Sequence, residues 1–332
     1  MLQSVTVPDF DIMKLLEESR LDGVAGHRTL GRLLRIIDDS HPLSDEIDKA
    51  VKTEAFRATR IGLTGPPGGG KSSLIASALE ILSGSSEPGD KSRKIGILAV
   101  DATSPYTGGA LLGDRVRLKG PVGQNVFFRS LASRGATGGV SRAIWPASRL
   151  LDWWGAEIIL IETVGSGQLG TAVADVADLV VAVLTPEAGD GIQSMKAGVM
   201  EMADIFIVNK SDRPGAELVL RELRFVQEEA SAAGRSVEVY HTSAVNGEGV
   251  REAVDGITAL WKKLEEKGEI RKRRLRQAGS EVARRVEERI RDEMTQRLGG
   301  TEAYKSALKE YAEKIIAGEI NPSSAAENLT KA

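Results

Sequence analysis

One segment limits what this chain can fold into more than any other, the glycine-rich turn Gly65-Pro-Pro-Gly-Gly-Gly-Lys71-Ser72. A short apolar run, Ile61–Leu63, leads into the turn, and a helical pattern begins at Lys71. Glycines let backbone N–H groups surround a phosphate without Cβ clashes, and the N-terminus of the helix adds partial positive charge. The segment therefore predicts a P-loop between a buried strand and a helix of an α/β fold.

The end of the turn carries the two side chains that a P-loop uses. Lys71 is expected to bridge the β- and γ-phosphates of a nucleoside triphosphate. The Ser72 hydroxyl is expected to coordinate Mg²⁺, a hard cation that prefers oxygen ligands. The complete predicted phosphate site is Gly65, Gly68, Gly69, Gly70, Lys71, Ser72 and Ser73.

Short β-branched runs alternate with longer helical stretches between Arg60 and about Gly249. This alternation is typical of an α/β protein in which helices cover both faces of a mostly parallel central sheet. Seven runs are expected to form the strands: Ile61–Leu63, Ile95–Val100, Val126–Phe128, Ile158–Ile161, Leu179–Leu184, Ile205–Val208 and Val237–Tyr240.

Three acids are candidates for the surroundings of a magnesium ion. Asp101 and Glu162 each end a predicted strand, and ligands of open α/β sheets bind at the carboxyl ends of the strands. Glu162 stands where many P-loop enzymes carry an aspartate that holds a magnesium-bound water. Asp114 lies in a glycine-rich loop and could approach the metal only when that loop closes, which makes it a switch-loop candidate.

The tetrapeptide Asn209-Lys210-Ser-Asp212 follows a buried strand, where a loop that reads the base belongs. A carboxylate at Asp212 can accept hydrogen bonds from N1–H and from the exocyclic amine of guanine. Adenine offers neither donor, and a polar site left unpaired discriminates strongly. After the next strand, Ser243-Ala244-Val245 is similar to the loop whose backbone contacts guanine O6 in GTPases. The pattern predicts GTP as the nucleotide.

Helical patterns flank this region, so we expect an N-terminal helical extension at 1–55, a P-loop GTPase domain at 56–255 and a C-terminal helical arm at 256–332. In the extension, Pro42 interrupts the helical pattern and Ser44 is expected to cap the next helix. In the arm, an apolar residue recurs at every fourth position from Val282 to Met294. The arm cannot bury this stripe by itself, and we expect it to form a homodimer.

Composition excludes several classes of function. The 332 residues contain no cysteine, which rules out disulfides, thiolate metal sites and a cysteine nucleophile and fits a reducing cytoplasm. The first ten residues show no secretory signal, and no apolar run approaches the ~20 residues of a membrane span. With a net charge of −3, the chain has no basic excess that would attract nucleic acid.

At this point the chain resembles the family of methylmalonyl-CoA mutase-associated GTPases. The most specific block is the stretch Val100-Asp-Ala-Thr-Ser-Pro-Tyr-Thr-Gly-Gly-Ala-Leu-Leu-Gly-Asp-Arg115. Further similar blocks are Gly26–Arg35, Phe128–Gly135, Glu162–Gly165 and Gly189–Lys196. The resemblance implies a chaperone of adenosylcobalamin-dependent acyl-CoA mutases that gates cofactor delivery and protects the mutase. It implies Mg²⁺ and GTP or GDP on this chain, and no bound cobalamin.

The resemblance also assigns roles to individual residues. It implies Ser72, Asp101, Asp114 and Glu162 around Mg²⁺, and Lys71, Asp114 and Lys196 as catalytic residues. Lys196 would lie in a third switch loop that moves when the mutase binds. Gly170 stands where the family usually has an acid, in a switch region expected near the partner. No Gln or His occupies an obvious water-activating position, so we expect slow hydrolysis that a partner accelerates.

Other functions compete with this interpretation. An older name for the family suggests a transport- or signalling-associated kinase, but the sequence has no kinase catalytic motif. The run Arg271-Lys-Arg-Arg-Leu-Arg276 could bind nucleic acid, although such runs more often lie on a solvated helix. A nickel-insertion GTPase is the nearest alternative, and against it stand the three histidines, His27, His41 and His241, which lack ligand spacing.

Overall fold

The computed structural model describes residues 11–51, 56–84, 93–101, 125–133, 141–163, 170–188 and 198–331. The chain forms two compact units, Met1–Arg274 and Leu275–Ala332. We describe each unit by itself.

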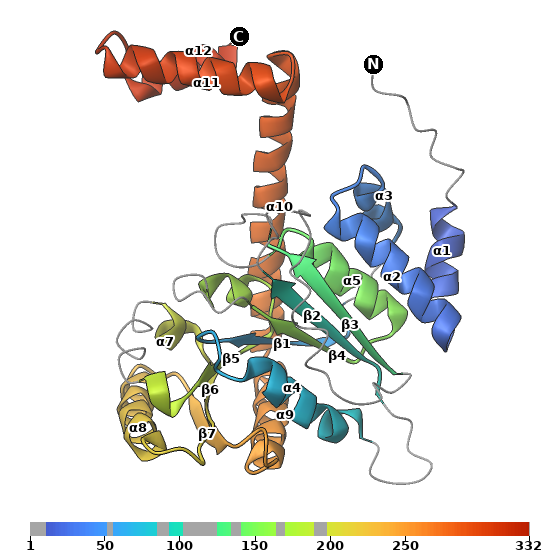
Figure 1. Ribbon diagram of the computed structural model, residues 1–332, viewed down its shortest axis with the longest axis vertical. Coiled ribbons are helices and arrows are strands. Elements are labelled where there is room, and N and C mark those ends of the chain that lie inside the picture. Colours follow the sequence, from blue (N-terminus) through green and yellow to red (C-terminus); the bar gives the residue numbers. More distant parts are fainter. Residues whose placement is uncertain are drawn as a thin grey trace. The chain divides into compact units, whose positions relative to one another are not determined.

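Within the described ranges, the first unit is built on a seven-stranded sheet with the strand order β3-β2-β4-β1-β5-β6-β7. Every pair of neighbouring strands is parallel, as the alternation of strands and helices predicts (Figure 1). The observed bounds extend or shift the predicted runs by a few residues. The strands are β1 (Thr59–Thr64), β2 (Ile95–Asp101), β3 (Val126–Ala132), β4 (Ile158–Glu162), β5 (Leu179–Leu184), β6 (Ile205–Asn209) and β7 (Glu238–Thr242).

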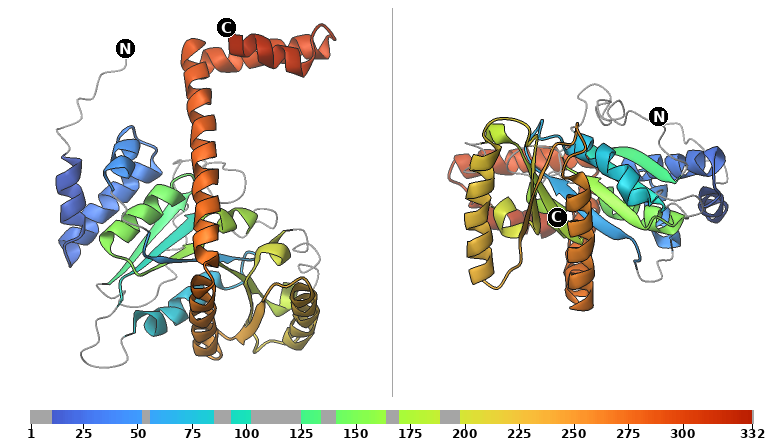
Figure 2. Two further views of the ribbon diagram at one scale, coloured as in Figure 1. Left: turned by 180° about the vertical axis from the view of Figure 1, so that it is seen from behind. Right: turned by 90° about the horizontal axis from the view of Figure 1, so that it is seen from below.

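Alternate side chains of the central strands enter two different cores. One face packs with α4 (Lys71–Ser83) and α9 (Val250–Glu266), through side chains such as Ile97 and Val181. The other face packs with α5 (Ile144–Trp154) and the N-terminal helices, through side chains such as Leu98 and Val180. Helices therefore cover both faces of the sheet (Figure 2). Strands β5 to β7, toward the β7 edge of the sheet, pack with α7 (Val199–Met202) and α8 (Ala216–Ala232). The described ranges also contain the short 3₁₀ helices η1 (Gly170–Asp175) and η2 (Pro186–Ala188).

The N-terminal helices are α1 (Ile12–Ser19), α2 (Val24–Asp38) and α3 (Leu43–Ala50), and the predicted apolar stripe of α2 is buried. The prediction that Ser44 caps the third helix is wrong, because α3 begins one residue earlier, at Leu43. Pro42 is the N-cap residue and forms no side-chain cap hydrogen bond, while Nδ1 of His41, one residue earlier, accepts a hydrogen bond from the N–H of Leu43 at 3.2 Å.

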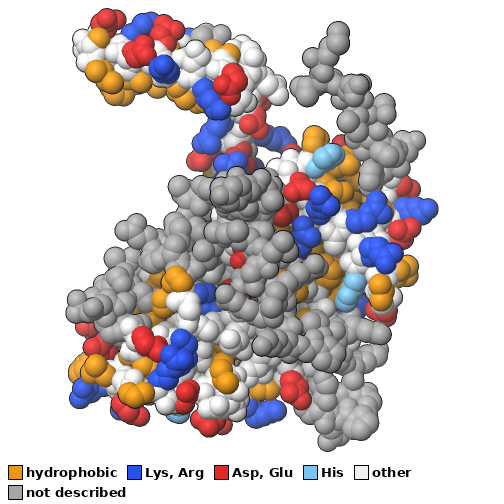
Figure 3. Space-filling model, viewed as in Figure 1, with side chains coloured by type: hydrophobic (Ala, Val, Ile, Leu, Met, Phe, Trp, Pro, Cys, Tyr) orange, Lys and Arg blue, Asp and Glu red, His pale blue; other side chains and the backbone are white. Residues whose placement is uncertain are grey.

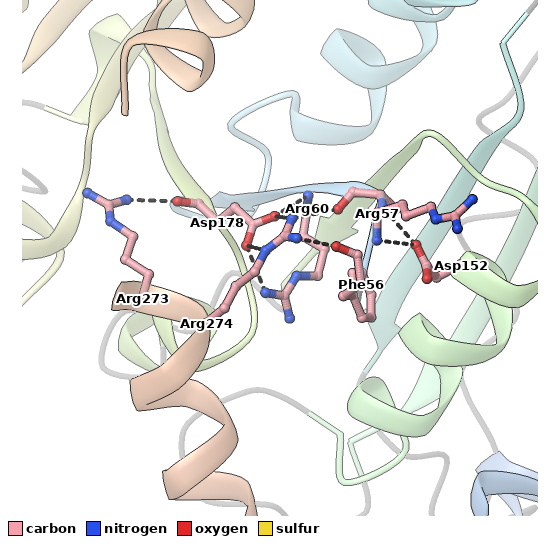
Figure 4. Close-up of polar contacts among 8 residues, drawn as sticks. Phe56, Arg57, Arg60, Asp152, Asp178, Arg273 and Arg274 are labelled. Carbon is pink, nitrogen blue, oxygen red and sulfur yellow. Dashed lines mark hydrogen bonds and ion pairs between the residues drawn. The ribbon is translucent and has the colours of Figure 1, made fainter. Parts of the chain in front are cut away.

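The basic run at the start of α10 (Glu269–Arg297) is partly buried in ion pairs (Figure 4). Arg274 bonds both carboxylate oxygens of Asp178, at 2.9 and 2.6 Å, and Arg273 bonds both oxygens of Asp204. Arg60 also pairs with Asp178 at 2.7 Å. These acids immediately precede strands β5 and β6, so two arginines of the run anchor the helix at the amino ends of the strands. That is a structural use of the charges, and it weighs against the nucleic-acid interpretation.

The second unit contains most of α10 together with α11 (Thr301–Ile316) and α12 (Pro322–Lys331). Val282, Val286 and Ile290 are each at least half exposed on α10. The predicted stripe is therefore present and uncovered. Apolar side chains also gather along one side of these helices in Figure 3. A groove of about 530 Å³ within the unit is lined mainly by apolar side chains, among them Ile290, Met294, Leu308, Tyr311 and Leu329.

Candidate functional site

The P-loop connects β1 to α4, and two of its glycines, Gly65 and Gly70, have neighbours too close to leave room for a side chain. Gly65 has φ +141°, and a Cβ atom on it would lie 2.1 Å from the carbonyl oxygen of Val183 in β5. Gly70 has φ +82°, and its Cβ would lie 2.2 Å from Nδ2 of Asn209. Residues that carry a side chain rarely adopt positive φ values of this kind. The loop therefore passes within contact distance of both β5 and the end of β6.

Lys71 is buried at the first position of α4. Its Nζ atom donates hydrogen bonds to the carbonyl oxygens of Gly65 and Pro66, at 3.0 and 3.1 Å. These bonds hold the ammonium group within the P-loop itself. A fixed cation there can offset negative charge on bound phosphates.

Two of the predicted magnesium residues touch each other. The Ser72 hydroxyl donates a hydrogen bond of 2.8 Å to Oε1 of Glu162. Parallel pairing places Glu162 opposite Leu63 of β1 and opposite Ala99 of β2, two residues before Asp101. Asp101 is 9% exposed. Asp101 and Glu162 therefore lie at the carboxyl ends of the neighbouring strands β2 and β4, and Ser72, in the first turn of α4, meets Glu162 there.

This set of oxygen atoms suits Mg²⁺, which is usually held by one or two carboxylates together with phosphates and water. Within the described ranges, no group of three or more His, Cys, Asp or Glu side chains could hold a metal ion by itself. Asp114 and Lys196, the other predicted residues of this region, lie outside the described residues.

Asn209 joins the P-loop to the predicted base loop. Its Nδ2 donates to the carbonyl oxygen of Gly69 at 3.0 Å. Its Oδ1 accepts from Thr242 Oγ1 and from the N–H of Ala244, both at 3.1 Å. The side chain is buried, and every atom that can form a hydrogen bond has a partner in the protein. The asparagine therefore positions the two loops relative to each other, a role that the motif alone does not reveal.

Asp212 is exposed beyond the end of β6, while Ser243 is buried at the end of β7. A hydrogen bond from the Ser243 side chain lowers the pKa of Asp212 and so favours the ionised carboxylate. Lys210 adopts φ +59°, a left-handed conformation that turns the chain between the end of β6 and Asp212. The predicted base-reading residues thus come together from two strands, with Ala244 half-buried and Val245 exposed beside them.

One ion pair beside this loop was not predicted. Arg213 pairs with Glu187 of η2 and lowers the pKa of that carboxyl to about 2. Both side chains are half exposed, and exposed pairs contribute little to stability. Nothing in the sequence spacing indicates the contact, because η2 and the base loop meet only through the pairing of β5 with β6.

A parallel sheet, a P-loop between β1 and α4, and an Asn-Lys-Ser-Asp loop after β6 together define a P-loop GTPase. A family model described as methylmalonyl Co-A mutase-associated GTPase MeaB matches residues 30–298. The chain belongs to this family and is a GTP hydrolase, as the sequence motifs predict.

Individual relatives agree with the assignment. A protein of Pyrococcus horikoshii named as a GTPase is 35% identical over 310 residues, covering 90% of this chain and 92% of the relative. The mitochondrial methylmalonic aciduria type A homolog of Mus musculus is 33% identical over 282 residues, covering 82% of this chain and 65% of the relative. A crystal structure of a LAO/AO transport system kinase has a TM-score of 0.66 at 20% identity and covers 98% of both chains, which supports the fold.

Among the described helices, none combines the length and the apolarity that crossing a membrane requires.

Proposed function

We propose that this chain is a Mg²⁺-dependent GTPase that acts as a chaperone of an adenosylcobalamin-dependent acyl-CoA mutase. In this role it gates delivery of the cofactor to the mutase and protects the mutase from inactivation. The observation that carries the proposal is the family match over residues 30–298, because the matched family is described by its association with methylmalonyl-CoA mutase. The mouse relative, named for methylmalonic aciduria, supports the same partner. The cytoplasm is the proposed compartment, on the absence of cysteine.

In the proposed site, Ser72, Asp101, Glu162 and Asp114 would hold Mg²⁺, and bound Mg²⁺ would offset charge on the β- and γ-phosphates. Lys71 adds positive charge from the P-loop, and the backbone N–H groups of the loop orient the phosphates. Asp212 selects guanine, and Asn209 keeps the base loop in register with the P-loop through its bond to Gly69. Hydrolysis then depends on positioning and electrostatics and needs no strong base.

The experiment that tests this function is steady-state GTP hydrolysis by the purified protein, alone and with each available adenosylcobalamin-dependent acyl-CoA mutase. ATP is the control nucleotide. We expect one mutase to raise the rate by at least about tenfold, since completing a phosphoryl-transfer site in trans has effects of this size or larger. Lys71→Ala should abolish turnover, and Lys196→Ala should keep the basal rate and lose the stimulation.

Three results would contradict parts of the proposal. A rate that no mutase changes would leave a GTPase without the proposed partner. Preference for ATP would remove the role of Asp212 in selecting guanine. Equal loss of basal turnover in the Lys71 and Lys196 variants would exclude the proposed switch role of Lys196.

We also propose that the C-terminal unit mediates a homodimer. Its support is the uncovered stripe of Val282, Val286 and Ile290, which leads to the apolar groove at Met294. Exposed apolar surface of this kind usually marks a contact with another protein.

Light scattering at micromolar concentration should give the mass of two chains. Val286→Asp should shift the protein to the mass of one chain, whereas Glu293→Asp, an exposed change on the same helix, should leave the dimer intact. A wild-type monomer would refute the dimer.

A further inference from the structure

Helix α2 ends in a buried carboxylate at an unfavourable position. Asp38 is the last residue of the 15-residue helix and is only 5% exposed. The C-terminus of a helix carries partial negative charge, which disfavours an acid there, and burial adds a desolvation cost. A buried carboxylate at this position is tolerated only when hydrogen-bond donors or positive charges compensate for both costs.

The compensating donors come from the edge strand β3, against which α2 packs (Figure 1). Oδ1 of Asp38 accepts a hydrogen bond from the backbone N–H of Ala132 at 3.1 Å. The Arg129 guanidinium lies 3.8 Å from Oδ2. In an edge strand of a parallel sheet, alternate residues direct their N–H groups outward, where no further strand can accept them. Asp38 takes the place of that missing strand at the carboxyl end of β3.

The bonded residue of β3 is the register partner of a proposed magnesium acid. Ala132 pairs with Asp101 of β2, and the N–H of Ser133 donates to the carbonyl oxygen of Asp101 at 2.9 Å. The path from Asp38 to Asp101 therefore consists of one side-chain hydrogen bond and the backbone pairing of two strands.

We propose that Asp38 is a positioning residue for the magnesium site. Its hydrogen bond to Ala132 fixes the end of β3, which is paired with the end of β2. The carboxylate of Asp101 is thereby held at the carboxyl ends of the strands, where the phosphates would bind. The N-terminal extension would then be part of the metal site's support and not only a cover for the sheet. This inference rests on the proposed function, because it takes Asp101 as an acid of the Mg²⁺ site.

The test measures Mg²⁺ dependence separately from nucleotide binding. Affinity for a fluorescent GDP analogue is determined in EDTA and then across a Mg²⁺ titration, for wild type and for Asp38→Ala. We expect equal affinity in EDTA and about a tenfold higher Mg²⁺ concentration for half-maximal enhancement, the lower end of the effect of losing an outer-shell partner. Amide hydrogen exchange across 126–133 should also become faster.

Two further variants separate positioning from general destabilisation. Asp38→Asn keeps an oxygen that can accept from Ala132 and should retain the Mg²⁺ dependence of the wild type. Asp39→Ala removes the neighbouring exposed carboxylate, which pairs with Arg35 on its own helix at 3.4 Å, and should change neither readout. Asp38→Leu is the second acceptor-free variant and should behave as Asp38→Ala does. If circular dichroism shows that Asp38→Ala does not fold, the Mg²⁺ dependence of Asp38→Leu is the measurement that tests the proposal.

The inference is overturned if the acceptor-free variants require the same Mg²⁺ concentration as wild type. It is also overturned if they lose GDP affinity equally in EDTA and in Mg²⁺, since a general structural role predicts that result. A wild-type protein whose GDP affinity does not respond to Mg²⁺ would instead refute the proposed magnesium site itself, and the wild-type titration alone distinguishes this case.

Discussion

Asp212→Asn should convert the preference of the protein from guanosine to xanthosine triphosphate. Guanine presents two donors, N1–H and the exocyclic amine, which a carboxylate can accept together. Xanthine presents N1–H and a carbonyl oxygen at the same edge, which match the oxygen and the NH₂ of a carboxamide. Because mismatched polar groups discriminate strongly, we expect kcat/KM for GTP to fall by at least about 10²-fold and that for xanthosine triphosphate to rise.

The control is Asp255→Asn, which neutralises an exposed acid on α9 and should leave both rates unchanged. Hydrolysis of the two triphosphates is measured side by side with each variant. Loss of GTP turnover without a gain for xanthosine triphosphate would show that Asp212 supports the loop, through its bond with Ser243, and does not read the base. Unchanged preference would exclude any contact with the base.

Arg274→Met should lower the free energy of unfolding by about 3–5 kcal/mol, because it leaves a buried carboxylate with part of its compensation removed. Asp178 has no exposed surface and is bonded by both Arg274 and Arg60 (Figure 4). Arg274 also donates to the carbonyl oxygens of Phe56 and Ala58, in the segment just before β1. Urea unfolding monitored by circular dichroism measures the loss.

Arg271→Ala is the matched control, because Arg271 belongs to the same basic run and is exposed. It should change stability by no more than about 0.5 kcal/mol. If the two variants unfold at the same urea concentration, the ion-pair cluster does not stabilise the fold.

The same cluster predicts the direction of a pH effect. Burial would raise the pKa of Asp178, but the hydrogen bonds and charges of Arg274 and Arg60 outweigh it and hold the pKa below its ordinary value. An acid with a depressed folded-state pKa adds stability above its unfolded pKa of about 3.9, and the contribution disappears as pH falls through the folded value. The stability difference between wild type and Arg274→Met should therefore be largest near neutral pH and shrink below about pH 4.

Local patterns predicted the central fold. The strand runs are continuous and apolar because both faces of the sheet are covered, so they are recognisable without any knowledge of their partners. The prediction for the last strand was displaced, since β7 is at Glu238–Thr242 and not at Val237–Tyr240. An edge strand is paired on one side only, and its half-exposed residues give a weaker pattern.

Contacts between distant segments were beyond the reach of pattern reasoning. Arg273 and Arg274 look like part of a solvated basic run, but their partners lie 69 and 96 positions away. Asn209 looks like a base-reading residue, yet the hydrogen bonds it forms within the protein go to the P-loop, to the last residue of β7 and to Ala244 just after that strand. In each case the partner is chosen by the strand order, which a single sequence does not state.

The sequence by itself determined the class of this protein, because its P-loop and its Asn-Lys-Ser-Asp tetrapeptide depend on residue types at short fixed spacings within one strand–loop–helix unit. Backbone geometry over such a short distance is set locally. Only the tertiary structure decided that Ser72 bonds Glu162, that Asp38 bonds the end of β3, and that Asp178 pairs with Arg274 near the start of α10. These contacts arise from the parallel register and from helix packing, which depend on the whole chain reaching one arrangement that buries its apolar faces together.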